Sequence, residues 1–227
     1  MNMYYQISGL GHLANQVWPV SELANPKLPT FENLLPPLSK APAEQFKVHP
    51  EFLLHKRNKL SDFISSSHLS ARHMFICSIN ACELIAASKT SKYQRFVCTV
   101  KYKETAHEYA ILFFYEVLYD VIDFQRSAFY IQKPYTYANN PDRARTPVAI
   151  DSYENYEAYK EKDIDIGVKK LYFINNLSYD FFRIDVPSFS GVYISESLKN
   201  IFEQNNISGY TLSGLDETGE LSKSIRY

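Results

Sequence analysis

Hydrophobic and polar positions are most clearly ordered between residues 191 and 212. This stretch has a β-prone run at 192–194, a favoured helix N-cap at Ser195, an apolar helix face, and a second β-prone run at 207–212. The helix face consists of Leu198, Ile201 and Phe202. The pattern therefore predicts a strand, a helix and a strand in succession.

An earlier stretch shows the same order of signals. Residues 74–76 predict a strand, Ser78 is a suitable cap, and apolar side chains follow at helical spacing. A shift of 117 positions places Ser78 on Ser195, Ala81 on Leu198, Leu84 on Ile201 and Ile85 on Phe202. Such a match arises either by duplication or by convergence on a common strand-cap-helix solution, and the sequence leaves both open.

Alternation along residues 94–103 predicts a strand with one buried face. The run 107–118 is rich in β-branched and aromatic residues, and we expect it to be a central strand in an antiparallel hairpin with the first; a buried helix is the alternative. Further strands are expected at 4–8, 46–48, 121–123, 128–131, 168–174 and 181–184. We also expect a helical turn around Asp62, a loop at 134–151 and a helix at 152–162.

Prolines divide the chain. Seven of the 11 prolines lie at or before residue 50, which forbids a continuous helix or a central strand there. We expect an N-terminal strand and Pro-rich arm over residues 1–44, a single domain over 45–212, and a polar C-terminal tail over 213–227. The predicted fold class is α+β: a mainly antiparallel sheet with a few packed helices and the arm.

Charge and composition narrow the function classes. The formal net charge is −1 and the pI is about 6.6, so the chain lacks the overall positive field of a nucleic-acid binder. The first residues lack a signal-peptide pattern, and the longest apolar stretch, 109–119, is too short to span a bilayer. We therefore expect a cytoplasmic protein with reduced thiols, and neither nucleic acid nor membrane as a partner.

Catalytic motifs are not evident in the sequence. It contains no P-loop, G-x-G-x-x-G, H-E-x-x-H or G-x-S-x-G pattern, and His68 and His73 have no nearby carboxylate or thiolate to complete a metal site. Asp120 and Asp123 are the nearest pair of carboxylates that could act as acid and base, but we favour the interpretation that they are turn-stabilising aspartates. We expect no catalytic residue, no metal and no cofactor.

One acidic segment suggests a binding surface. Residues 151–165 carry six carboxylates and two lysines, with tyrosines between them. Long-range charge speeds the encounter with a basic partner, and tyrosines supply desolvated contacts. The alternative is an ordinary solvated helix. The candidate contact residues are Tyr153, Glu154, Tyr156, Glu157, Tyr159, Glu161, Asp163 and Asp165.

The stretch 191–212 resembles the C-terminal signature of immunity protein family 11 of bacterial polymorphic-toxin systems, formerly a domain of unknown function. That signature has a strand, a Ser-Glu-x-Leu-Lys segment, an amphipathic helix and an apolar-x-Gly-aromatic step. The matching residues here are Ser195, Glu196, Leu198, Lys199, Ile207, Gly209 and Tyr210. Weaker similarities are Tyr4-Tyr5, Asp62-Phe63, residues 123–127 and Phe182-Arg183-Ile184.

The resemblance implies an antidote that binds a cognate toxin domain and occludes its active site or substrate groove; it names no toxin chemistry. Two alternatives stay open. The first is a small hydrolase or toxin-modifying enzyme that uses Asp120 and Asp123. The second is a nucleic-acid or ligand-binding regulator that uses a basic strand face, formed by Arg95, Lys101 and Lys103.

Overall fold

The structure is a computed structural model, and it describes residues 3–9, 17–19, 49–54, 58–64, 74–132, 145–215, 218–221 and 225–226. The expected strand at 46–48 and most of the Pro-rich arm lie outside these ranges. The described residues confirm the α+β class, with strands that pair antiparallel except for one parallel pair, β3 with β6.

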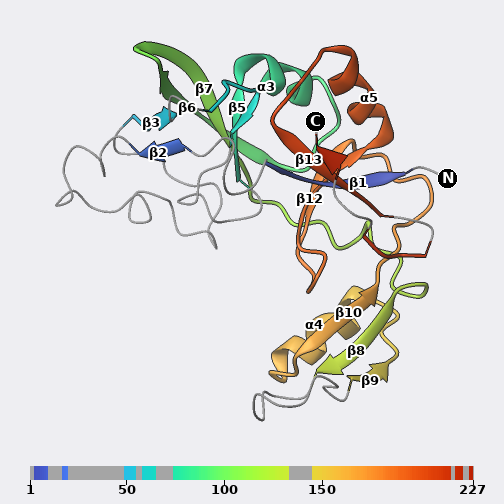
Figure 1. The fold of residues 1–227 in the computed structure, drawn as a ribbon. Coiled ribbons are helices and arrows are strands. Elements are labelled where there is room, and N and C mark those ends of the chain that lie inside the picture. Colours follow the sequence, from blue (N-terminus) through green and yellow to red (C-terminus); the bar gives the residue numbers. More distant parts are fainter. Residues whose placement is uncertain are drawn as a thin grey trace.

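Three helices and three sheets make up the described part of the chain (Figure 1). The helices are α3 (Ile79–Ala86), α4 (Tyr153–Glu161) and α5 (Glu196–Gln204). The five-stranded sheet has the order β11 (Phe181–Ile184), β12 (Gly191–Ser195), β1 (Tyr4–Gly9), β13 (Tyr210–Leu215) and β14 (Ile225–Arg226). The six-stranded sheet has the order β2 (Val17–Pro19), β3 (Glu51–Leu54), β6 (Tyr93–Tyr102), β7 (Thr105–Phe114), β5 (Met74–Ser78) and β4 (Phe63–Ile64). The three-stranded sheet has the order β10 (Ile166–Lys170), β8 (Ala128–Gln132) and β9 (Arg145–Val148).

The two larger sheets share one plan. In what we call the first unit, β4, β5, β7 and β6 lie side by side and α3 follows β5; in the second unit, β11, β12, β1 and β13 take the same places and α5 follows β12. All neighbouring strands in both sets are antiparallel. The strand-cap-helix match in the sequence is therefore a structural equivalence of two units.

Strand register confirms the equivalence residue by residue. Ser78, at the end of β5, pairs with Tyr109 of β7. Ser195, at the end of β12, pairs with Tyr4 of β1 in the same way. The shift of 117 positions also carries Tyr93, the first residue of β6, onto Tyr210, the first residue of β13. The repeat thus continues through the helix into the next strand, beyond the stretch that the sequence pattern marked.

The two units differ in which part of the chain supplies the strand at the place of β7. In the first unit β6 and β7 form a hairpin that turns between Tyr102 and Thr105. In the second unit the place of β7 is taken by β1, which lies between β12 and β13 and comes from the opposite end of the chain. Strand β1 therefore lies inside the second unit in space, although it is far from the other strands of that unit in sequence.

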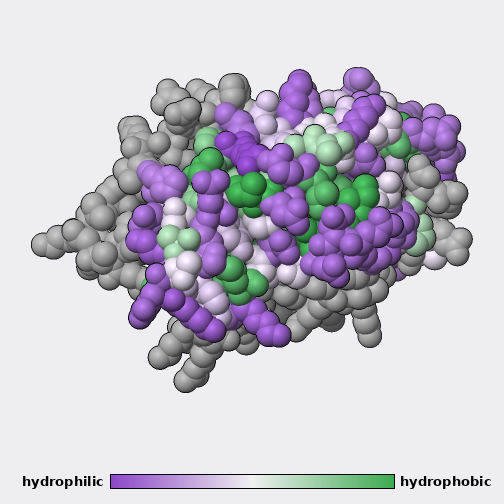
Figure 2. Space-filling view, turned by 90° about the horizontal axis from the view of Figure 1, so that it is seen from above, coloured by the Kyte–Doolittle hydropathy of each residue, from purple (hydrophilic) through white to green (hydrophobic). Residues whose placement is uncertain are grey.

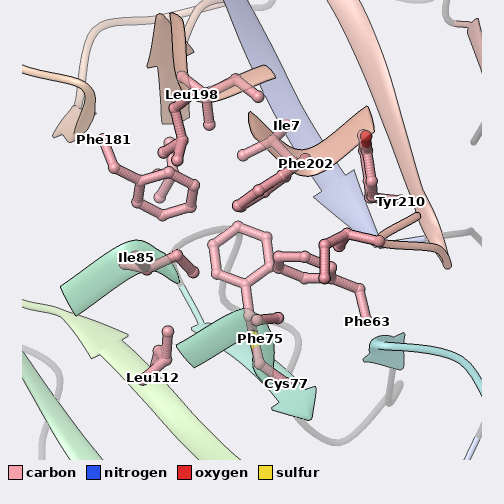
Figure 3. Close-up of a cluster of buried hydrophobic side chains, with 14 of the residues drawn as sticks. Ile7, Phe63, Phe75, Cys77, Ile85, Leu112, Phe181, Leu198, Phe202 and Tyr210 are labelled. Carbon is pink, nitrogen blue, oxygen red and sulfur yellow. The ribbon is translucent and has the colours of Figure 1, made fainter. Parts of the chain in front are cut away.

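A shared apolar core joins the two units. α3 and α5 lie side by side above the sheets (Figure 1), and the side chains beneath them come from both units (Figure 3). Phe63 of β4 contacts Phe202 of α5 and Tyr210 of β13, at ring-centroid distances of 5.7 and 5.6 Å. In the opposite direction, Phe181 of β11 lies 4.9 Å from Phe114 of β7. Each unit thus buries its short outer strand against the other unit.

From residue 109 onward, strand β7 is buried on both faces of the six-stranded sheet. Along β7, residues 110, 112 and 114 enter the shared core, and residues 109, 111 and 113 enter a second cluster on the other side of the six-stranded sheet. This confirms the expected hairpin and two-sided strand, although β7 ends at Phe114, before the expected end at residue 118. The far face of the five-stranded sheet, with Tyr193 and Phe182, packs against the region of α4 and the three-stranded sheet.

Several sequence predictions are wrong in detail. Phe63 and Ile64 form strand β4 instead of a helical turn, because they pair with Cys77 and Ile76 of β5. Of the expected strand at 121–123, only an isolated bridge at Ile122 is present. Strand β9 lies in the expected loop, β10 ends before residue 174, and β13 runs from Tyr210 to Leu215, past the expected end at 212. The division at residues 44 and 212 stays a prediction.

Candidate functional site

Helix α4 begins and ends at clear local signals. The Ser152 hydroxyl accepts a hydrogen bond from the Asn155 amide at 3.2 Å, Glu154 lies in the first turn, and Lys160 lies in the last. Asp163, just after the helix, has a φ of 56° and donates its backbone N–H to the Lys160 carbonyl. These ends hold a short helix of low hydrophobicity on the outside of the three-stranded sheet, below the body in Figure 1.

The three tyrosines of α4 face inward. Tyr153, Tyr156 and Tyr159 are spaced by three residues, so they lie on one side of the helix, and all three pack against the apolar cluster that joins the five-stranded sheet to the three-stranded sheet. Tyr156 is 2% exposed and lies within 6.2 Å of the rings of Phe124 and Phe129. The expected role of Tyr156 in contacting a partner is therefore wrong, because the helix uses this side chain to anchor itself.

A half-exposed aromatic pair borders the helix. The ring of Tyr153 stacks on that of Tyr119, with centroids 4.4 Å apart and an interplanar angle of 24°. The Tyr119 hydroxyl donates a hydrogen bond to the Asp185 carbonyl at 3.2 Å. Burial, together with the negative charges of Asp185 and Glu157, raises the pKa of Tyr119 above its usual range. This pair escaped the sequence analysis because Tyr119 lies outside the acidic segment.

The acidic side chains of α4 and the turn after it point outward. Within the described part of the chain, none of the four exposed carboxylates has an ion-pair partner; these are Glu154, Glu161, Asp163 and Asp165. Glu157 is half-buried and pairs with Lys160 at 3.1 Å. The structure therefore separates the predicted contact residues into an inward tyrosine face and an outward acidic face.

Asp123 has a structural role. Its carboxylate accepts a hydrogen bond from the Arg126 amide at 3.1 Å, and its backbone carbonyl accepts one from the Ser127 amide at 3.0 Å. The Ser127 hydroxyl in turn accepts from the Tyr172 amide at 3.0 Å. This is the local network expected of a turn-stabilising aspartate. Asp120 lies exposed beside it.

The basic strand face of the second alternative is largely neutralised. Arg95 pairs with Glu83 at 2.7 Å, and Lys101 pairs with Glu51 at 2.8 Å. The Lys103 ammonium lies 4.9 Å from the centre of its neighbouring ring, that of Tyr102. This arrangement does not favour a surface that attracts phosphates.

The signature residues Glu196 and Lys199 join β1 to α5. The Tyr5 hydroxyl donates a hydrogen bond to Glu196, and the Lys199 ammonium lies 3.1 Å from the other oxygen of that carboxylate and 5.0 Å from the Tyr5 ring centre. Burial and the Glu196 carboxylate raise the pKa of Tyr5 to about 12, and the Tyr5 hydrogen bond lowers the pKa of Glu196. These residues therefore hold the N-terminal strand against the helix.

The upper face of the molecule, seen in Figure 2, carries both hydrophobic and hydrophilic residues. Apolar surface occupies its middle and is interrupted by polar side chains. Leu84 on α3 is partly buried, and its equivalent Ile201 on α5 is 36% exposed. Isolated apolar residues of this kind are common on protein surfaces.

Neither a metal site nor a membrane span emerges from the described residues. No group of three or more His, Cys, Asp or Glu among them is placed to hold a metal ion. None of the helices they form has the length and apolar character needed to cross a bilayer. His68 and His73 lie outside the described ranges.

Comparison with known protein families and with curated proteins finds no match to this sequence. The likeness to immunity protein family 11 stays a prediction based on the residues between 195 and 210.

Proposed function

We propose that this protein is an immunity protein that binds a cognate bacterial toxin domain and blocks its active site or substrate groove. The observation that carries the proposal is the outward acidic face of α4, whose exposed carboxylates have no ion-pair partner among the described residues. A face of this kind speeds association with a basic surface and is available to pair with it. The resemblance of residues 195–210 to an immunity family supports the same function.

The anchoring of α4 suits such a role. Tyr156 and its neighbours fix the inward side of the helix in the core, so the acidic side chains project from a rigid element. A rigid surface loses less conformational entropy on binding than a mobile one. The half-exposed stack of Tyr119 and Tyr153 lies beside the charges and offers the aromatic contact that interfaces favour.

Co-expression gives the first test. A toxic domain encoded next to this chain should arrest growth when expressed alone, and this chain should restore growth at stoichiometric levels. Protection by amounts of the chain far below those of the toxin would instead favour an enzyme. Failure to bind or protect against such a neighbouring toxin would overturn the proposal.

Charge reversal locates the contact. A triple variant changes Glu154, Glu157 and Glu161 to lysine, and calorimetry of the toxin complex at low and high salt should show binding weakened about tenfold or more at low salt. The matched control reverses three carboxylates on other elements, Glu104, Glu108 and Glu203. Equal losses in the two variants would show that net charge alone matters and would remove α4 as the contact surface.

A further inference from the structure

Two thiols meet at the start of α3. Cys77 precedes the cap residue Ser78, and Cys82 is the fourth residue of the helix. Side chains at these two positions contact each other across a helix N-cap, where apolar pairs form a hydrophobic staple. Both cysteines belong to the shared core, where Cys77 lies below Phe75 (Figure 3). The Cys82 sulfur also lies 3.9 Å from the Cys77 carbonyl oxygen.

The equivalent positions of the second unit are filled differently. Ile194 takes the place of Cys77, and Lys199 takes the place of Cys82. Ile194 is buried in the core, and Lys199 lies over the Tyr5 ring and pairs with Glu196. Since the fold does not require two sulfur atoms here, the thiol pair adds chemistry that is specific to the first unit.

The two thiols are electrostatically unequal. A hydrogen bond from Cys77 and the nearby Arg95 guanidinium lower the pKa of Cys82, whereas burial raises the pKa of Cys77. Burial also raises the pKa of the third thiol, Cys98. The nearby Arg95 guanidinium favours the thiolate form of Cys82, and the neighbouring Cys77 is in position to resolve an oxidised Cys82.

We propose that Cys77 and Cys82 form a dithiol modification site that hydrogen peroxide converts into a disulfide. The Cys82 thiolate attacks one peroxide oxygen, the O–O bond breaks, hydroxide leaves, and Cys82 becomes a sulfenic acid. The Cys77 thiolate then attacks the Cys82 sulfur and displaces a second hydroxide as the S–S bond forms. Two thiols lose two electrons and two protons, and the peroxide is reduced to two waters.

Access sets the rate of this reaction. Cys77 is 0% exposed and Cys82 is 1% exposed, so peroxide reaches them when the first turn of α3 opens. The product ties β5 covalently to α3 at the boundary between the two units. The inference does not depend on the proposed function.

Oxidation of the intact protein tests the proposal. The folded chain is treated with hydrogen peroxide, denatured, alkylated and analysed by intact mass and peptide mapping. We expect two of the three free thiols to be lost, so the intact mass before alkylation falls by about 2 Da because two hydrogens leave, and alkylation adds one group instead of three. The peptide map should show Cys77 joined to Cys82, and a dithiol reductant should reverse all these changes. Alkylation of all three cysteines, disulfides that include Cys98, or irreversible overoxidation of Cys82 would overturn it.

Cysteine variants test which thiols form the disulfide. Cys98→Ser should still lose two thiols, whereas Cys82→Ala should form no intramolecular disulfide. Circular dichroism and thermal unfolding show whether each variant is folded. Because the peptide map of the unsubstituted protein needs no variant, a variant that fails to fold still leaves the proposal open to refutation.

Discussion

Asp62 and Asp180 hold equivalent positions in the two units, and each carboxylate accepts a hydrogen bond from the serine that caps the helix of its own unit. The Ser78 hydroxyl donates to Asp62 at 2.7 Å, and the Ser195 hydroxyl donates to Asp180 at 2.8 Å. The backbone amides of the same serines donate to the carbonyls of the same aspartates, at 2.7 and 2.8 Å. Each aspartate thus fixes the start of a helix.

The second carboxylate oxygen of each aspartate reaches the other unit. Asp62 accepts from the amide of Ser208, which follows α5, at 3.0 Å, and Asp180 accepts from the amide of Lys89, which follows α3, at 3.2 Å. The two contacts are reciprocal. They join the end of each helix to the short outer strand of the opposite unit.

We therefore expect Asp62→Ala to lower the free energy of unfolding by about 2–3 kcal/mol, because it leaves several donors without their charged acceptor. Urea unfolding measures the change. Asp120→Ala is the matched control, since Asp120 is exposed, and it should shift stability by no more than about 0.5 kcal/mol. Equal effects of the two substitutions would contradict the assigned role of Asp62.

Phe63→Ala should lower the free energy of unfolding by more than Asp62→Ala does. The Phe63 ring is buried and packs edge-on against Phe75 as well as against Phe202 and Tyr210 of the other unit. Loss of a large core aromatic typically costs about 3–5 kcal/mol. Thermal unfolding of this variant, compared with that of Val97→Ala on the exposed face of β6, checks the prediction. A loss no larger than that of the control would show that Phe63 does not join the units.

The β6–β7 turn should be open to stabilisation. Lys103 and Glu104 have φ values of 47° and 69°, a conformation that two-residue hairpins reserve for Asn and Gly. Replacing them with Asn and Gly should raise the free energy of unfolding by about 1 kcal/mol. Urea unfolding should also show Lys103→Val to be destabilising, because a β-branched residue resists positive φ. A stabilising effect of valine would contradict this explanation.

Glu196 should contribute to stability at neutral pH and lose that contribution in acid. Its hydrogen bond from Tyr5 lowers its pKa below the ordinary value of 4.5. A lowered carboxyl pKa stabilises the folded state above the unfolded value, and the stabilisation disappears as the pH falls through the folded value. The stability difference between the unsubstituted protein and Glu196→Gln should therefore shrink from pH 6 to pH 3, as followed by urea unfolding. A constant difference across this range would contradict the assignment.

Local patterns in the sequence identified much of the fold. The caps Ser78 and Ser195 and the alternation of β6 are short-range signals, and the structure confirms them. The strand at Phe63 was missed because only its pairing with β5, more than ten residues away, makes it a strand. Strand β9 was missed because Pro147 suggests a loop, although proline is tolerated at the edge of a sheet.

The full extent of the repeat was hidden by a change in spacing. Asp62 precedes its cap serine by 16 residues and Asp180 precedes its own by 15, so one shift cannot align both the aspartates and the caps. Glu154 and Glu161 of α4 are exposed and Glu157 is half-buried, whereas the inward direction of Tyr156 depends on the three-residue spacing of the tyrosines and on a core formed by distant strands.

The position of β1 has a consequence for biosynthesis. Tyr5 and Glu196, which hydrogen-bond across the second unit, are 191 residues apart, whereas the strands and helix of the first unit follow one another within residues 63–114. As the nascent chain leaves the ribosome, the first unit can assemble early from its own contiguous segment. Strand β1 emerges before it and stays unpaired until β12 and β13 have been synthesised, so this segment remains accessible to chaperones during that interval.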